Sequence, residues 1–221
     1  MSEASIDAIL LELKESITVK QTVVFCGAGI SRHSGLPLAN ELVRYVLEML
    51  NVLKEQTETI INSNLPFEAF IETLREASDI DRILDIFHLG IPNTNHILLA
   101  KLAKAKYLKT ICTTNFDQLI ERALQSEGLV KGEDFQVFYK EDDFSHIDWD
   151  DDKIHLIKIH GSVEDKDNMA VTLQQVAKQE LSAQRMRVIE HIFSKGADQN
   201  VLVLGYSCSD VFDISPQIKA I

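Results

Sequence analysis

The sequence predicts an α/β protein, with a parallel β-sheet covered by helices. Four short runs are apolar along nearly their whole length, as is typical of strands buried on both faces of a parallel sheet: Thr22–Cys26, Leu108–Thr113, His155–His160 and Asn200–Gly205. Helical patterns alternate with these runs, which favours strand–helix–strand crossovers. The chain has 221 residues and is 45% hydrophobic, which is enough to bury a core without disulfide bonds.

Apolar residues at helical spacing predict the covering helices. These cover Leu38–Leu50, Phe67–Glu76, Asn93–Lys104, Phe116–Gln125 and Leu181–Phe193. An earlier amphipathic helix is expected over Ile6–Ile17, where its apolar stripe is either core or a self-association surface. Residues 51–107 hold several helical patterns and no convincing strand, so we expect a helical insertion or cap there. Little sequence follows the last strand, which suggests a longer native chain or a partner that completes the core.

Composition excludes several classes of protein. Acidic residues outnumber basic ones by 34 to 22, giving a net charge of −12, which argues against direct nucleic-acid binding. The three cysteines form no C-x-x-C pair, so no zinc ribbon or other metal is expected and a reducing cytoplasm fits. Neither a signal peptide nor a run long enough to span a bilayer is present, so we expect no membrane association.

The segment Glu141–Asp152 is strongly acidic. Seven of its twelve residues are Asp or Glu. The spacing does not follow that of an EF-hand, so a solvated acidic loop is expected, with calcium binding as the alternative.

The first two predicted strands each end in small or polar residues. Gly27-Ala28-Gly29-Ile30-Ser31 follows the first strand, and glycines there let backbone amides approach a phosphate. Arg32 occupies the third glycine position of a dinucleotide fingerprint, so that motif fails, and a loop of about ten residues leads to the next helix. Thr113-Thr114-Asn115-Phe116-Asp117 follows the second strand, where Asn115 and Asp117 either cap a helix or contact a ligand.

The other two strand ends continue this pattern. His160-Gly161-Ser162 offers either a base near neutral pH or a core histidine, whereas His155 faces the opposite side of the strand and reads as structural. Gly205-Tyr206-Ser207-Cys208-Ser209-Asp210 forms either an ordinary turn or a contact for ribose or adenine. Because carboxyl ends of parallel strands meet at one edge of a sheet, these segments predict a shared ligand crevice.

The ordered set GAGIS, SGLP, TTNFD, IHGS and GYSCSD resembles the sirtuin superfamily. TTNFD with GYSCSD, and Asn95-His96 followed by Leu99-Ala100 and Leu102-Ala103, are similar to its bacterial branch of NAD-consuming defence proteins. This resemblance implies a Rossmann-like sheet and NAD as a substrate, cleaved between nicotinamide and ribose.

The resemblance also implies roles for individual residues. Asn115, preceded by Thr114, would orient the nicotinamide ribose and the attacking group, and Asp117 would fix this turn. His160 would be the base. The other NAD contacts would be Gly27, Ala28, Gly29 and Ser31 around the pyrophosphate and ribose, and Gly205, Ser207, Ser209 and Asp210 around the adenosine half.

Three departures from protein-deacylating sirtuins shape the functional expectation. The zinc module with two C-x-x-C pairs is missing, Leu38-Ala39-Asn40 replaces Asp-Phe-Arg, and Thr114-Asn115 replaces Gln-Asn. Water therefore becomes the expected acceptor, which makes the chain an NAD glycohydrolase that releases nicotinamide and ADP-ribose, as an antiphage effector. The alternatives are a deacylase or ADP-ribosyl transferase, and a non-catalytic NAD or ADP-ribose-binding domain. A homo-oligomer is expected, controlled by assembly, a partner ATPase or a further domain.

Overall fold

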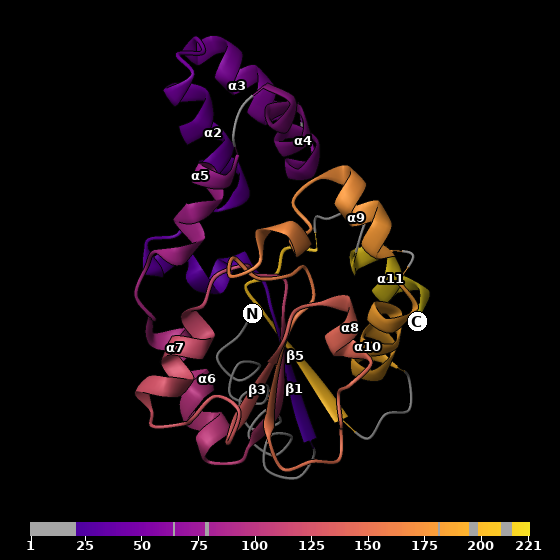
Figure 1. Ribbon diagram of the computed structural model, residues 1–221. Coiled ribbons are helices and arrows are strands. Elements are labelled where there is room, and N and C mark those ends of the chain that lie inside the picture. The colour runs from indigo at the N-terminus through magenta and orange to yellow at the C-terminus, as the bar shows by residue number, and fades with distance from the viewer. Residues whose placement is uncertain (1–20, 64, 78–79, 181, 195–198, 209–213) are drawn as a thin grey trace, which may run out of the picture.

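The structure, a computed structural model, describes residues 21–63, 65–77, 80–180, 182–194, 199–208 and 214–221. Its centre is a five-stranded parallel sheet in the order β3-β4-β2-β1-β5 (Figure 1). The strands are β1 Gln21–Cys26, β2 Leu108–Thr113, β3 Phe135–Phe138, β4 Ile154–Lys158 and β5 Gln199–Leu204. The helix predicted over Ile6–Ile17 lies outside the described residues.

The four predicted strands are all present, and the sheet has one more. β3 pairs in parallel with β4 and forms an edge of the sheet. It is four residues long, with both end residues buried and the two central residues more exposed. Its sequence is not continuously apolar, because an edge strand does not need both faces buried. The strand predicted to reach His160 ends earlier, at Lys158, where the chain enters a turn.

Helices cover both faces of the sheet, as predicted. On one face lie α6 (Thr94–Lys104) and α7 (Leu119–Ser126), whose apolar residues pack with Ile111 and Leu156 of the sheet. The other face packs against α10 (Ala183–Phe193) and Ile214 of α11 (Ile214–Ala220), with α8 (Glu141–Phe144) beside them. The predicted Rossmann-like α/β architecture is therefore confirmed (Figure 1).

A second group of helices lies beyond the sheet in Figure 1. It comprises α2 (Ala39–Met49), α3 (Lys54–Asn62), α4 (Phe67–Ala77), α5 (Asp81–Leu84) and the short 3-10 helix η2 (Asp85–His88). Buried side chains of α2, α4 and α5 form a separate core with Val163, Met169 and Val171. We call α2–α5 the helical cap. As expected, all described elements within 51–107 are helical. The cap differs from the predicted segment in two ways: it includes α2, which precedes residue 51, and it excludes α6, which packs on the sheet.

The segment between β1 and α2 differs from the expected loop. Residues Ala28–Ser34 form a 3-10 helix, η1, that ends at Gly35 with a φ of 85°. α2 then begins at Ala39, close to the predicted start at Leu38. The segment is therefore folded compactly against the site instead of being an open loop.

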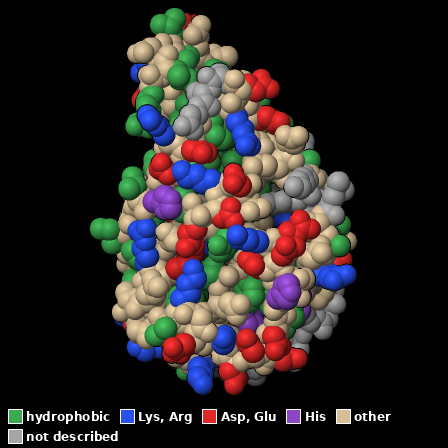
Figure 2. Space-filling model, viewed as in Figure 1, with side chains coloured by type: hydrophobic (Ala, Val, Ile, Leu, Met, Phe, Trp, Pro, Cys, Tyr) green, Lys and Arg blue, Asp and Glu red, His purple; other side chains and the backbone are tan. Residues whose placement is uncertain are grey.

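The acidic segment after β3 is only partly a solvated loop. It contains α8, whose Phe144 is buried, and Asp151 accepts a hydrogen bond at 2.8 Å from Nε2 of the fully buried His155. Figure 2 shows acidic and basic side chains interspersed over the visible face of the sheet domain. Among the helices that the structure describes, none is long and apolar enough to cross a bilayer.

Candidate active site

A cleft of about 550 Å³, counting space open to solvent, lies at the carboxyl ends of β1 and β2. The helical cap and the β1–α2 segment supply apolar walls, and the floor is polar. The cleft is lined by Ala28, Ser31, Leu36, Pro37, Ala39, Leu42, Phe67, Phe87, Thr114, Asn115, Phe116 and Asp117. The GAGIS and TTNFD segments therefore share one cleft, whereas none of the described residues of the IHGS and GYSCSD segments lines it.

The floor of the cleft is a buried hydrogen-bond network centred on Ser31. Its Oγ donates to Asp117 Oδ2 at 2.9 Å and accepts from Asn115 Nδ2 at 3.1 Å. His96 Nε2 lies 3.2 Å from the same oxygen. Since all four residues are buried, the hydrogen bonds hold these side chains in one arrangement.

His96 belongs to this network, although no role was predicted for it. Asn93 caps α6, and the backbone N–H of Asn93 donates to His96 Nδ1 at 3.2 Å. Nδ1 is therefore the acceptor, so Nε2 carries the proton and donates to Ser31. Burial lowers the pKa of His96, although the charge of Asp117 acts in the opposite direction. The lowered pKa favours the neutral form. The available signal was the spacing Asn93-x-x-His96, which matches an N-cap and its third helical residue.

Asn115 presents one unused acceptor. The side chain is 6% exposed, its Nδ2 is bound to Ser31, and its backbone N–H donates to Thr113 Oγ1 at 3.0 Å. Its Oδ1 is buried and has no hydrogen-bond partner among the described residues. Leaving a buried amide oxygen without a hydrogen bond costs free energy of folding. We therefore expect a ligand hydroxyl or a water molecule to donate to this atom.

Asp117 bonds to the start of α7 and to the floor of the cleft, and its contact with a ligand stays a prediction. Its Oδ1 accepts from the backbone N–H of Leu119 at 3.0 Å, in the first turn of α7. Its Oδ2 accepts from Ser31 at the floor of the cleft. One carboxylate therefore both caps a helix and orders the site.

The glycines after β1 serve a purpose that the sequence analysis did not predict. The N–H groups of Gly27 and Gly29 donate to Leu204 O at 2.9 Å and Gly205 O at 2.8 Å, so these two amides already have partners. A Cβ at Gly29 would lie 2.7 Å from Gly205 O. Close approach of the turns after β1 and β5 therefore requires glycine, and the predicted contacts of Gly27, Ala28, Gly29 and Ser31 with NAD stay a prediction.

The fourth predicted segment is only partly described. Gly205 and Ser207 are exposed in the turn after β5, whereas Ser209 and Asp210 lie outside the described residues. The contacts of this segment with the adenosine half of NAD stay a prediction.

His160 lies beside the cleft and is not among the residues that line it. Its ring centroid is 6.3 Å from that of Phe116, which does line the cleft. The turn holding it requires Gly161, because φ is +93° and a Cβ would lie 2.5 Å from Asn168 O. His155, within β4, is buried and bonded to Asp151, in agreement with its predicted structural role.

Two buried cysteines lie at the carboxyl ends of β1 and β2. Burial, with the nearby Asp117 charge, raises the pKa of the Cys26 thiol to about 12, and burial raises that of Cys112 as well. Both thiols are therefore protonated near neutral pH. In the part of the chain that the structure describes, no three His, Cys, Asp or Glu side chains gather as a metal site would require.

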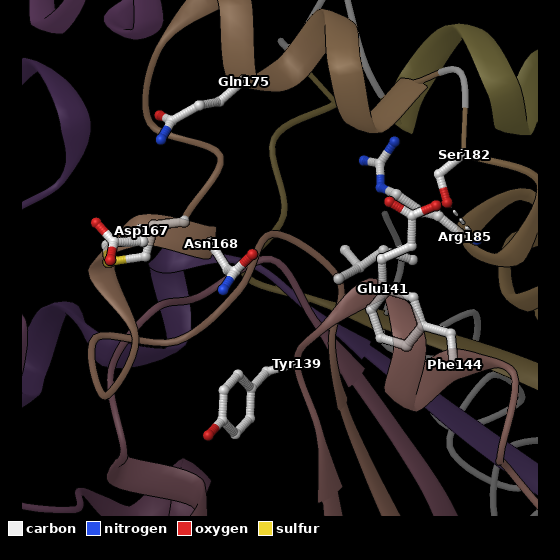
Figure 3. Close-up of a pocket in the computed structure, with 10 residues that line it drawn as sticks. Tyr139, Glu141, Phe144, Asp167, Asn168, Gln175, Ser182 and Arg185 are labelled. Atoms are coloured by element: carbon white, nitrogen blue, oxygen red, sulfur yellow. Dashed lines mark hydrogen bonds between the residues drawn. The ribbon is translucent and has the colours of Figure 1, made fainter.

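A second cavity opens near the ends of β3 and β4 (Figure 3). Its walls come from the end of β3, α8, the segment after His160, α9 (Leu173–Glu180) and α10, and include Tyr139, Glu141, Asn168, Gln175, Ser182 and Arg185. Arg185 is 1% exposed, and its backbone N–H donates to Ser182 Oγ. This cavity and the first cleft have no lining residue in common.

A parallel α/β sheet covered by helices, with a cleft outside the carboxyl ends of its strands, defines a Rossmann-like domain. Residues 109–221, just over half of the chain, match the family model of the SIR2-like domain. The chain therefore belongs to the SIR2-like domain family.

The chain is also similar to individual proteins. The NAD(+) hydrolase ThsA of Acinetobacter baumannii (strain 532279) is 31% identical over 137 residues, which cover 59% of this chain and 25% of that protein. The chain thus covers about a quarter of the length of this curated relative. The structure of Sir2Tm bound to a propionylated peptide is 18% identical, with a TM-score of 0.44 over 94% of this chain and 79% of that one. A complex of a Sir2 homologue with NAD is 21% identical, with a TM-score of 0.32 over 51% of this chain and 41% of that chain.

Proposed function

We propose that this protein is an NAD glycohydrolase. The C1′–N1 bond between ribose and nicotinamide breaks, and its electron pair neutralises the pyridinium nitrogen. A water oxygen bonds to C1′ and loses a proton, so the products are nicotinamide, ADP-ribose and H⁺. The observation that carries this proposal is the buried Asn115 Oδ1, which has no partner among the described residues and belongs to a residue that lines the cleft.

The cleft chemistry suits the nicotinamide end of the substrate. Its walls include Phe67, Phe87 and Phe116, which suit a flat aromatic ring, and its polar floor suits a carboxamide and ribose hydroxyls. Because nicotinamide leaves as a neutral molecule, no strong general acid is required. The barrier is lowered by stabilising an oxocarbenium-like ribose, as in glycoside hydrolysis.

Asn115 and His160 divide the remaining work in this proposal. Asn115 Oδ1 accepts a hydrogen bond from the attacking water or a ribose hydroxyl and so orients it. His160 takes the proton, a role that typically contributes about 10²- to 10⁴-fold in rate. The proposal requires the ribose to lie on the side of the Phe116 ring that faces His160.

The biological role is proposed from the family resemblance. We propose that the protein depletes cellular NAD as an antiphage effector. A constitutive hydrolase would harm its own cell, so its activity is held off by assembly into a homo-oligomer, by a partner ATPase or by a further domain. The name of the relative ThsA supports the hydrolase reaction in this proposal.

Incubation of the purified chain with NAD, followed by chromatography of the products, tests the reaction. We expect equal amounts of nicotinamide and ADP-ribose. Asn115→Ala should lower turnover about 100-fold or more, because the attacking group loses its orientation. Asn62→Ala, an exposed position at the end of α3, is the matched control and should retain wild-type turnover.

Other outcomes would redirect the assignment. Transfer of ADP-ribose to protein, or deacylation of an acyl-lysine peptide, would indicate the second enzyme class. Calorimetric binding of NAD without nicotinamide release would indicate a binding domain. Wild-type turnover in Asn115→Ala would remove the proposed role of the amide.

A further inference from the structure

A buried ammonium group lies beneath the two turns that carry Asn115 and His160. Lys158 is the last residue of β4 and is 0% exposed. Its Nζ donates to Asp117 O at 2.7 Å and Phe116 O at 3.1 Å. It also donates to Ser162 Oγ at 2.8 Å and Glu121 Oε1 at 2.9 Å.

These four acceptors come from three separate segments of the chain. The two carbonyls directly follow Asn115, Ser162 lies two residues after His160, and Glu121 is on α7. Ser162 in turn donates to Glu164 Oε2 at 3.4 Å. A lysine ammonium has three hydrogens, so the four contacts use its full donor capacity. A single cation therefore binds both the turn after Asn115 and the turn after His160.

Fold stability alone is a poor explanation for this arrangement. Glu121 is 5% exposed, and burial raises the pKa of its carboxyl despite the neighbouring Lys158. A buried ion pair gains little over apolar residues of similar volume, because both charges lose their hydration. An apolar side chain, however, could not bind the Phe116 and Asp117 carbonyls. The backbone N–H of Val163 also donates to Phe116 O at 3.0 Å, and Lys158 adds a side-chain attachment that includes Asp117 O and Ser162 Oγ.

We infer that Lys158 is a positioning residue, which holds Asn115 and His160 at the separation that the reaction requires. This inference rests on the function proposed above, since it concerns the same site. Lys158 does not line the cleft and acts only through the backbone of residues 116 and 117 and the hydroxyl of Ser162.

Three variants of the full chain separate positioning from stability. Lys158→Met leaves Glu121 as an unpaired buried charge and should lower the unfolding midpoint. The double variant Lys158→Met/Glu121→Leu removes both charges and should recover most of that midpoint. Lys109→Met is the matched control, because Lys109 Nζ also donates to a backbone carbonyl, Trp149 O at 2.8 Å, near the amino end of β2.

Turnover is then measured per folded molecule by nicotinamide release. We expect the double variant to keep its low kcat, about 10- to 100-fold below wild type, as expected for misplaced groups, while KM for NAD changes little. Lys109→Met should keep wild-type kcat. A double variant that recovers both stability and kcat would overturn the inference.

Hydrogen exchange gives a readout that does not depend on catalysis. Peptides covering residues 114–121 and 160–164 should both exchange faster in the double variant than in Lys109→Met. If these peptides of the double variant exchange at the wild-type rate, the inference is overturned, whatever the stabilities of the variants. If the wild-type chain releases no nicotinamide, the proposed function fails, and the exchange data still decide whether Lys158 holds the two turns.

Discussion

The hydrogen bonds of Ser31 fix the orientation of the Asn115 amide. The serine has one hydroxyl hydrogen, which it gives to Asp117, and its lone pairs accept from Asn115 and His96. If the amide were reversed, its oxygen would face an oxygen with no hydrogen to offer. The helix cap at Asn93 thus sets the His96 tautomer, which helps to aim Asn115 Oδ1 away from Ser31.

Ser31→Ala tests this account at the level of a single hydroxyl. The variant leaves Asn115 Nδ2 without its acceptor, so the amide loses its fixed orientation. We expect kcat for nicotinamide release to fall about 10- to 100-fold, with the fold retained. Circular dichroism and steady-state kinetics provide the measurements.

Ser126→Ala is the control for this prediction. Ser126 Oγ also makes an internal hydrogen bond, to Ala123 O at 2.8 Å, but at the far end of α7. Its turnover should match wild type. Equal, unchanged kcat values in both serine variants would mean that the Ser31 bond does not orient the amide.

At the scale of elements, the turns after the strands decide how closely the segments of the site approach. Gly29 packs against Gly205, and Gly161 packs against the Asn168 carbonyl. At Gly161 and Gly205 the backbone also has positive φ, which other residues adopt at a cost. These turns leave no room for a side chain, so their glycines are structural requirements of the site.

Gly161→Ala and Gly132→Ala form a matched pair that separates backbone strain from steric clash. The φ values are +93° and +92°, so both variants carry similar strain, about 1–3 kcal/mol. Only the Gly161 variant also forces a Cβ to within 2.5 Å of a backbone oxygen, whereas nothing lies within 4 Å at Gly132. We expect Gly161→Ala to lose about 1–3 kcal/mol more unfolding free energy.

Urea unfolding of both glycine variants measures this difference. The Gly161 variant should also lower nicotinamide release, because His160 directly precedes the distorted turn. Equal losses of stability in the two variants would contradict the packing account.

At the scale of the whole molecule, buried histidines link stability to pH. Burial lowers the pKa of His96, His155 and His191. The unfolded chain, with histidine pKa values near 6.5, therefore binds more protons than the folded chain as the pH falls. The stability from neutral, buried histidine is fully present above about pH 6.5 and is lost as the pH falls towards the lowered folded-state pKa.

His96→Gln isolates one contribution to this pH dependence. Glutamine at the third helical position can accept from the N-cap N–H through Oε1 and donate to Ser31 through Nε2, without titrating. Between pH 7 and pH 5 the unfolding free energy of the variant should fall less steeply than that of wild type. Chemical unfolding across this range measures both slopes, and identical slopes would show that His96 does not contribute.

The sequence by itself determined the architecture and the identity of several candidate residues. Four runs that are apolar on both faces can only be buried in a covered sheet, and all four are strands. Parallel strands end at one edge, so the residues after β1 and β2 had to meet, and Ser31, Asn115 and Asp117 do. These inferences succeed because strand burial and strand direction are local properties with a fixed geometric consequence.

Only the tertiary structure decided how these residues are held. His96 is distant from Ser31 in sequence, and Lys158 is distant from both Phe116 and Glu121. Their hydrogen bonds depend on the packing of α6 and α7 against the sheet. The structural role of Gly27 and Gly29 also depends on tertiary packing, because their amides donate to carbonyls at the end of β5 and in the turn after it. A residue type and its spacing define what a group can donate or accept, whereas its actual partner is set by which segments the folded chain brings within about 3 Å.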